Sequence, residues 1–135
     1  MSAGATTRCV LVAQGHPRLS EGLRGWLQAS FDGVFMVADR ASLLEGVTRL
    51  QPALVVVDLA LAEGRLAALL ADMQQQAPHS RTLLLSDHDD PRADAVALAA
   101  GAAAVVHKAA LAYELSPAVD AVLAGRRFSP SAGAH

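Results

Sequence analysis

The sequence is poor in cysteine, in aromatic residues and in long apolar runs, and these shortages exclude several classes of protein. Cys9 is the single cysteine, so the chain can form neither an intrachain disulfide nor a metal site of the CxxC type. No apolar run approaches the roughly 18 residues of a membrane span, and residues 1–7 lack the apolar segment of a signal peptide. We therefore expect a cytoplasmic protein that does not contact membranes.

A strong charge of either sign is also missing. The formal net charge is −2, with acidic and basic residues interspersed, whereas a nucleic-acid-binding surface needs a basic patch. The five histidines are not spaced as i, i+4 pairs, which would place two of them on one helix face. The composition therefore favours neither nucleic acid as a partner nor a metal site built from histidines.

What is present suffices for one folded domain. The chain has 135 residues, of which 53% are hydrophobic and only 4% aromatic, so the core must be built mainly from Ala, Val and Leu. We predict a flexible N-terminus over residues 1–7, a folded domain over residues 8–125 and a linker-like tail over residues 126–135.

Short apolar runs alternate with amphipathic helical patterns along this domain. Each run holds about five apolar or β-branched residues without strict alternation, as in strands that are buried on both faces. The predicted strands are Cys9–Ala13, Val34–Ala38, Ala53–Asp58, Thr82–Ser86 and Ala103–His107. A helical pattern follows each run, and the fourth, Pro91–Ala100, is predicted from its alanine content and Asp-Pro start. Five strand–helix units with right-handed crossovers predict an α/β fold of three layers, a doubly wound five-stranded parallel sheet of the flavodoxin-like kind.

Two helices carry specific expectations. Leu19, Leu23, Trp26 and Leu27 form one apolar stripe, which predicts that Trp26 belongs to the core. In the last helix, Ser116-Pro117 has the pattern of an N-cap and first turn, although the apolar stripe already begins at Leu115. This helix is therefore expected either to start late or to be kinked.

Polar side chains at the ends of the predicted strands are the candidate functional residues. The third strand ends in Asp58, the fourth ends in Ser86, and Lys108 follows the fifth. Because the carboxyl ends of parallel strands share one edge of the sheet, these three side chains are expected to be neighbours. No glycine-rich phosphate-binding turn follows the first strand, and Ser86 has no G-x-S-x-G context, so we do not expect an enzyme.

This arrangement and its spacing resemble the receiver domain of bacterial response regulators, in particular the NarL/LuxR-like group. The resemblance covers the chain from residue 8 to about residue 130 without a gap. The segments that carry it are His16–Leu23, Leu50–Leu61, Arg81–Asp90, Ala99–Ala109 and Val122–Pro130.

The resemblance implies roles for the residues at the strand ends. In that family the aspartate that ends the third strand accepts a phosphoryl group from a histidine kinase, which implies that Asp58 is the phosphoacceptor. The matching roles of Ser86 and Lys108 are contacts to phosphoryl oxygens. Each residue also has a purely structural alternative: Asp58 and Lys108 as an ion pair, and Ser86 or Gln14 as a side chain that bonds to local backbone.

The chain departs from the family at the metal site. The family binds magnesium through two acids after the first strand, the acceptor aspartate and a backbone carbonyl two residues later, here Ala60. Gln14 and Gly15 stand at the positions of the two acids. With one carboxylate left, we expect no magnesium ion or a weakly bound one.

Two further positions differ from the family pattern. Asp87 stands where a small residue usually follows the strand-four hydroxyl, and it is expected either to repel a phosphate or to replace a missing metal ligand. Val105 stands at the switch position, where many receivers have an aromatic residue, and a short β-branched side chain cannot make that two-position switch.

Three functional hypotheses follow for two-component signal transduction. The first is an atypical, degenerate receiver that acts through a signalling protein partner or as a homodimer, with weak or absent phosphorylation. Its expected contact surface lies within residues 90–124 and includes Leu98, Val105 and Tyr113. The second is a functional phosphoacceptor that tolerates a poor metal site and has a histidine kinase as its partner. The third is the regulatory part of a transcription factor whose helix-turn-helix output domain is not present in this chain.

Overall fold

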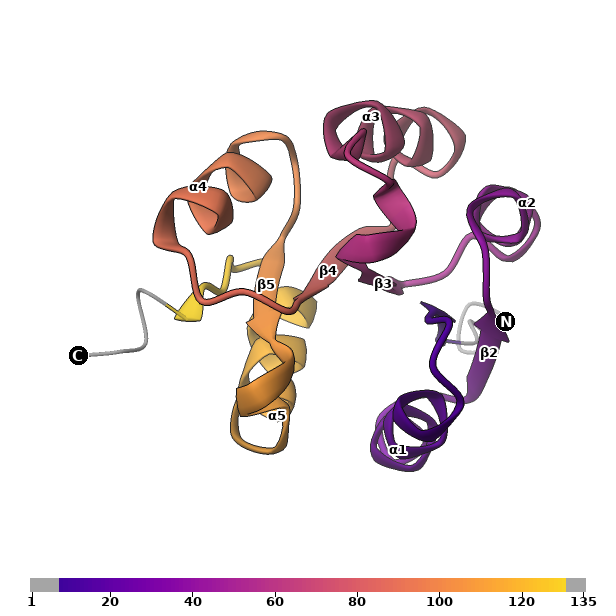
Figure 1. The fold of residues 1–135 in the computed structure, drawn as a ribbon. Helices are drawn as coiled ribbons and strands as arrows, with labels where there is room; N and C mark the ends of the chain where they lie inside the picture. The colour runs from indigo at the N-terminus through magenta and orange to yellow at the C-terminus, as the bar shows by residue number, and fades with distance from the viewer. Residues whose placement is uncertain (1–7, 131–135) are drawn as a thin grey trace.

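The fold, described for residues 8–130 by a computed structural model, is one five-stranded parallel sheet with the strand order β2-β1-β3-β4-β5. Helices cover both faces of the sheet (Figure 1). The strands are β1 (Cys9–Ala13), β2 (Gly33–Val37), β3 (Leu54–Asp58), β4 (Arg81–Ser86) and β5 (Ala104–His107). The α-helices are α1 (Pro17–Leu27), α2 (Arg40–Leu50), α3 (Leu66–Gln76), α4 (Pro91–Ala99) and α5 (Leu111–Leu123), and the 3-10 helices are η2 (Leu59–Ala62) and η3 (Lys108–Ala110). Residues 1–7 and 131–135, where a flexible N-terminus and the end of a linker-like tail were predicted, lie outside the described residues.

The predicted α/β fold is confirmed. Each predicted strand is present with its ends within one residue of the prediction, and α4 begins at Pro91 as expected. The start of α4 is fixed by Asp90, whose Oδ1 accepts the backbone N–H of Arg92 at 3.0 Å. Such a cap satisfies a free N–H of the first helical turn.

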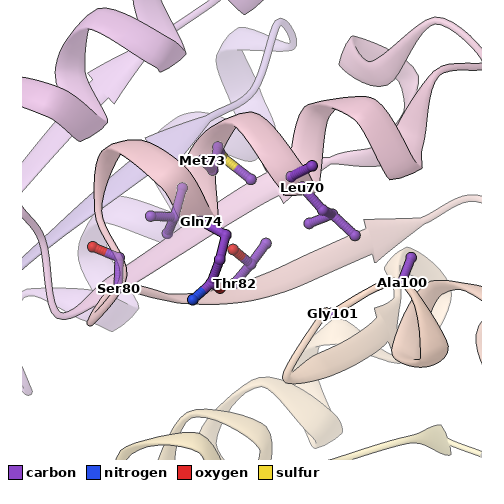
Figure 2. A pocket seen from close by; sticks show the side chains of 9 residues that line it. Leu70, Met73, Gln74, Ser80, Thr82, Ala100 and Gly101 are labelled. Carbon is purple, nitrogen blue, oxygen red and sulfur yellow. The ribbon is translucent and has the colours of Figure 1, made fainter.

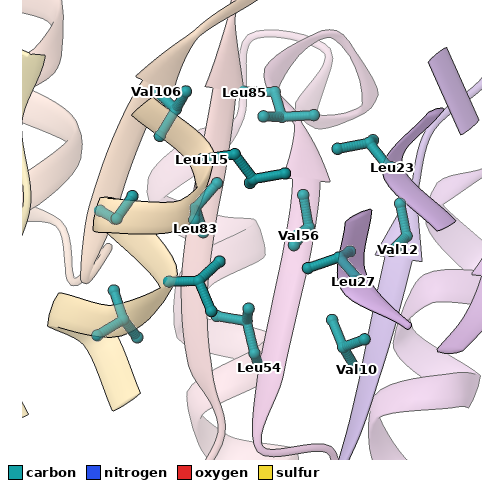
Figure 3. Close-up of a cluster of buried hydrophobic side chains, with 14 of the residues drawn as sticks. Val10, Val12, Leu23, Leu27, Leu54, Val56, Leu83, Leu85, Val106 and Leu115 are labelled. Carbon is teal, nitrogen blue, oxygen red and sulfur yellow. The ribbon is translucent and has the colours of Figure 1, made fainter. Parts of the chain in front are cut away.

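The core is divided into two layers by the sheet. One layer lies between the sheet and helices α1 and α5, and Figure 3 shows its close-packed Val and Leu side chains. The other layer lies between the sheet and helices α2, α3 and α4. Neighbouring residues of each strand point into opposite layers, for example Val56 into the first and Val57 into the second. Because both faces of β1, β3, β4 and β5 are buried, these strands are apolar except near their ends, whereas the edge strand β2 is only partly buried.

The prediction that Trp26 belongs to the core is wrong. Leu23 and Leu27 are buried beneath α1, whereas Trp26 is 47% exposed. Trp26 lies at the border of the buried stripe and lines a shallow groove with Leu115 and Val119 of α5. The apolar stripe of α1 is therefore narrower than its sequence pattern suggested.

The prediction of a late start for the last helix is also wrong. Helix α5 begins at Leu111, and Pro117 lies inside it. Pro117 has no N–H to donate to the carbonyl of Tyr113, so one helical hydrogen bond is lost. Leu111 and Leu115, which precede the proline, are buried against the sheet. Their burial outweighs the lost bond and extends the helix toward β5.

The segment after α5 returns to the sheet. Phe128 pairs with β5 through two backbone hydrogen bonds, from its own N–H to the carbonyl of Ala103 and from the N–H of Val105 to its carbonyl. The Phe128 side chain also packs against the core layer of α1 and α5. The beginning of the expected linker is therefore attached to the domain. None of the helices within residues 8–130 is long and apolar enough to cross a membrane.

Candidate functional site

The structure brings Asp58 and Lys108 into direct contact at the carboxyl edge of the sheet. Asp58 ends β3, and Lys108 directly follows β5 as the first residue of η3. The Nζ atom of Lys108 lies 2.7 Å from Oδ2 of Asp58. Only 6% of the Asp58 side chain is exposed, while the Lys108 side chain is partly buried. The two residues thus form an ion pair across the end of β4, which lies between their strands.

Both oxygens of the Asp58 carboxylate accept hydrogen bonds from the protein. Oδ1 accepts the backbone N–H of Ala60 at 2.9 Å, because the chain turns directly into η2 after β3. Burial alone would raise the pKa of Asp58, but hydrogen bonds from Lys108 and Ala60, the nearby amide of Gln14 and the charge of Lys108 hold this pKa below its usual value. Asp58 is therefore a charged carboxylate at neutral pH.

Lys108 has a second carboxylate partner, Asp87. The Oδ1 atom of Asp87 lies 3.0 Å from Nζ of Lys108, and 57% of the Asp87 side chain is exposed. Burial would lower the pKa of Lys108, but its contacts with Asp58 and Asp87 raise this pKa above the usual value. Two carboxylates and one ammonium give the cluster a net charge of −1. Asp87 was expected only as a neighbour of phosphate or metal, and its ion pair with Lys108 was not predicted.

Ser86 lies at the same edge, but its hydroxyl bonds to local backbone. Its Oγ accepts the N–H of His88 at 3.1 Å and donates to the carbonyl of His88 at 3.0 Å. The side chain is buried at the end of β4. In this arrangement the hydroxyl stabilises the turn between β4 and α4, which is the structural alternative for this serine.

The side chain of Gln14 is buried with its amide oxygen directed to the backbone. Oε1 accepts the N–H of His16 at 2.8 Å, which identifies the other atom of the amide as the nitrogen. That nitrogen has no hydrogen-bond partner of ordinary geometry among the described residues, yet it is close enough to Asp58 to lower the pKa of that carboxylate. Gln14 therefore presents a donor toward Asp58, where a metal site would need an acceptor.

The residues of this edge do not fit a magnesium ion. Magnesium needs oxygen ligands in near-octahedral geometry. The oxygens of Gln14 and Asp58 already accept protein hydrogen bonds, and the carbonyl of Ala60 accepts the N–H of Glu63 at 3.3 Å. Gly15 has no side chain to contribute. Within residues 8–130, no three His, Cys, Asp or Glu side chains gather as metal ligands do.

A buried pair of polar residues, His107 and Asp94, joins β5 to α4. Nε2 of His107 lies 3.0 Å from Oδ2 of Asp94, and both side chains are buried. On the other side of the imidazole ring, Nδ1 lies 3.7 Å from the exposed Asp89. This pair was not predicted from the sequence. The only indication in the sequence was an aspartate, Asp94, in an alanine-rich helix, and this does not identify the residue that it contacts.

The expected interaction surface is partly corrected by the structure. Tyr113 is 84% exposed on α5, as an interaction residue must be, but Val105 is buried within the sheet and cannot contact a partner. Leu98 is half-buried and packs against the core layer of α2, α3 and α4. Val96, which the sequence analysis missed, is 65% exposed on α4. Its side chain was not recognised because the weak periodicity of this alanine-rich helix does not separate its faces.

A small hollow of about 200 Å³ lies at the other end of the strands, near the start of β4 (Figure 2). It is enclosed by α3, the start of β4 and the turn after α4, with Met73, Gln74, Thr82 and Gly101 among its lining residues. None of the residues around Asp58 lines it. The ion-pair cluster and this hollow are therefore separate features of the domain.

Comparisons with known proteins identify a family and several solved structures that are similar to this chain. The sequence model of the response regulator receiver domain matches residues 10–120. A two-component response regulator of the LuxR family from Aurantimonas sp. SI85-9A1 is 30% identical, and its structure has a TM-score of 0.78 over 94% of this chain and 92% of that one. The signal receiver domain of NarL from Mycobacterium tuberculosis is 28% identical, with a TM-score of 0.74 over 89% and 98% of the two chains. The receiver domain of RcsB from Salmonella enterica serovar Typhimurium is 22% identical and shares the fold, with a TM-score of 0.76 over 91% and 92%. No curated protein sequence matches significantly.

The ion pair predicts a pH-dependent stability. Because the pKa of Asp58 is lowered by folding, its stabilising contribution is present above its ordinary pKa and is lost as the pH falls through the lower folded value. We expect Lys108→Met to reduce the free energy of unfolding by about 2–3 kcal/mol at pH 7, since it leaves Oδ2 of a buried carboxylate without a hydrogen-bond donor while Oδ1 keeps the N–H of Ala60. Urea unfolding of both proteins should show this difference shrinking below about pH 4, where carboxylates become protonated. The double variant Asp58→Asn/Lys108→Met should recover part of the loss. A difference that stays constant from acid to neutral pH would contradict this account.

The residues that follow β1, Gln14 and Gly15, predict that a magnesium site can be created by substitution. A Cβ at Gly15 would meet only the carbonyl oxygen of Ala38, at 3.9 Å, so an aspartate fits there. We expect Gln14→Asp combined with Gly15→Asp to show magnesium binding in isothermal titration calorimetry, where the parent shows little or none. The same pair of substitutions with Asp58→Asn serves as the control and should bind less. Absence of any gain would mean that the turn after Asp58, or Asp87, blocks the site by itself.

Proposed function

The chain belongs to the response regulator receiver domain family, and from this premise we propose that it is an atypical receiver that signals through protein–protein contacts. Phosphorylation of Asp58 is weak or absent in this proposal, and the domain is a cytoplasmic binding module and not an enzyme. The observation that supports this proposal is the set of hydrogen-bond donors around Asp58. Protein N–H groups and Lys108 hold this carboxylate, and no acid pair follows β1 to bind magnesium.

The electrostatics of phosphoryl transfer support weak phosphorylation. The carboxylate of Asp58 would attack phosphorus while the bond to the leaving group breaks, and negative charge on the transferring oxygens must be neutralised. Magnesium neutralises part of this charge in metal-dependent phosphoryl transfer. Here Lys108 is the ammonium in contact with Asp58, and its charge is shared with Asp87. The cluster has a net charge of −1 before a phosphoryl donor arrives, which opposes the approach of an anion.

The proposed contact surface is formed by the exposed faces of α4 and α5. Val96 and Tyr113 are large apolar or aromatic side chains that are mostly exposed. Such side chains frequently anchor protein interfaces. The partner in this proposal is a second copy of the domain or another signalling protein, such as a histidine kinase, and not nucleic acid.

A second candidate function is that of a working phosphoacceptor that controls a DNA-binding output domain outside this chain. It is favoured by one observation, the charged Asp58 beside Lys108 with Ser86 at the same edge. The two candidates differ in how fast Asp58 reacts with a phosphoryl donor and in whether magnesium matters.

Reaction with acetyl phosphate separates the two candidates. We expect intact-mass spectrometry to show little or no phosphoryl adduct after incubation with acetyl phosphate, with or without magnesium. The Asp58→Asn variant provides the baseline. A magnesium-dependent adduct that is abundant in the parent and vanishes in Asp58→Asn would reject weak phosphorylation and favour the second candidate.

The contact surface is tested by charge substitutions. We expect Val96→Glu to weaken self-association, measured by sedimentation velocity, by more than about tenfold, because it places a charge in the interface. Asp58→Ala should leave self-association within about threefold, since association in this proposal does not require phosphorylation of Asp58. Phe35→Glu, a change of the same kind at the opposite edge strand β2, is the matched control. If Asp58→Ala abolished association and Val96→Glu had no effect, both the surface and the trigger would be misidentified.

A further inference from the structure

We propose that the carboxylate of Asp87 acts as a permanent anion beside Asp58. It occupies the solvent side of Lys108 and holds the β4–α4 connection in one conformation without phosphorylation. This inference deepens the proposed function and rests on it. Its starting point is the ammonium of Lys108, which contacts two carboxylates at once, Asp58 at 2.7 Å and Asp87 at 3.0 Å. A single ammonium between two carboxylates has little capacity left for a third anion.

The two carboxylates approach Lys108 from different sides. Asp58 belongs to β3 and is almost completely buried, whereas Asp87 follows β4 and is largely exposed. An anion from solvent therefore meets Asp87 before it can reach Lys108. A phosphoryl group joined to Asp58 would also lie beside Lys108 and would compete with Asp87 for the same ammonium. The contact of Asp87 with this ammonium also disfavours its use as a ligand for a cation, because like charges repel.

The contact with Lys108 fixes the connection that leads into α4. Asp87 is the first residue after β4, and it lies within the Ser86–His88 turn, before the Asp90 cap of α4. Every residue of this connection from Ser86 to His88 thus has a side-chain or backbone bond that orients it. Two side-chain contacts join the connection to the end of β5: the ion pair of Asp87 with Lys108 at 3.0 Å, and the longer contact of the exposed Asp89 with His107 at 3.7 Å. An anion that displaced Asp87 would break the first of these contacts.

The experiment compares Asp87→Ala with Asp89→Ala. Asp89 lies in the same connection and is exposed, and its carboxylate contacts His107 and not Lys108, so both variants remove one negative charge from the same loop. The first readout is the rate at which acetyl phosphate modifies Asp58 at a fixed magnesium concentration, followed by intact mass. We expect Asp87→Ala to react about twofold to fivefold faster than the parent, the range that the loss of a partly exposed ion pair allows. Asp89→Ala should react at the parental rate.

The second readout is amide hydrogen exchange over residues 86–92. Exchange should be faster in Asp87→Ala than in the parent and unchanged in Asp89→Ala, because only the first variant loses the ion pair with Lys108, whereas the contact of Asp89 with His107 is longer, at 3.7 Å, and involves a largely exposed carboxylate. Equal exchange in all three proteins would overturn the inference. This readout remains decisive if no protein is modified at a measurable rate.

The two proposals fail in different ways. Abundant modification of the parent would reject the proposed weak phosphorylation, whatever Asp87 does. A ratio of rates near one between Asp87→Ala and the parent would reject the role of Asp87, whatever the parental rate is. A faster rate in Asp89→Ala as well would show that charge in the loop, and not the contact with Lys108, limits the reaction, and would also overturn the inference.

Discussion

The buried carboxylate of Asp58 sets the arrangement of the whole carboxyl edge of the sheet. A charged group in this position loses its water, and it is stable there only if donors surround it. The N–H of Ala60 and the ammonium of Lys108 supply direct hydrogen bonds. The first requires the chain to turn into η2 directly after β3, and the second requires Lys108 to follow β5 at once. The placement of two helical turns thus depends on one carboxylate.

The neutral amide of Gln14 is consistent with this arrangement. A second and third carboxylate beside Asp58 would repel it unless a cation were bound between them. Gln14 instead contributes an amide nitrogen that lowers the pKa of Asp58, while its oxygen is used by the backbone of His16. The edge therefore holds Asp58 in its charged form with protein groups alone. The ammonium of Lys108 is not available to Asp58 alone, since it also pairs with Asp87.

The sequence was informative where a simple physical rule decides the outcome. Continuous apolar runs such as Val55–Val57 become strands buried on both faces, and the shared edge of parallel strands brings Asp58 and Lys108 together. Contacts made by side chains from turns could not be predicted in this way. The partner of Asp87 depends on the conformation of the β4–α4 connection, which the Ser86–His88 bonds determine. The exposure of Trp26 depends on how α1 rotates against its neighbours, and the apolar spacing of α1 does not define that rotation within one residue.

The contacts at the end of β5 explain how a receiver surface can be kept in one arrangement. His107 and Lys108 are consecutive, and they bind different parts of the same neighbourhood, α4 through Asp94 and the β4–α4 connection through Asp87. The first contact is buried, so breaking it would leave a polar group without a partner in the core, and it resists displacement. The second contact is partly exposed and is open to competing anions. Helix α4 and the connection that precedes it are therefore held to the end of β5 by one buried contact and one partly exposed contact. The short Val105 side chain between the sheet and α4 leaves little steric means of switching the helix, so the proposed regulation of the α4 surface acts through the charge around Lys108.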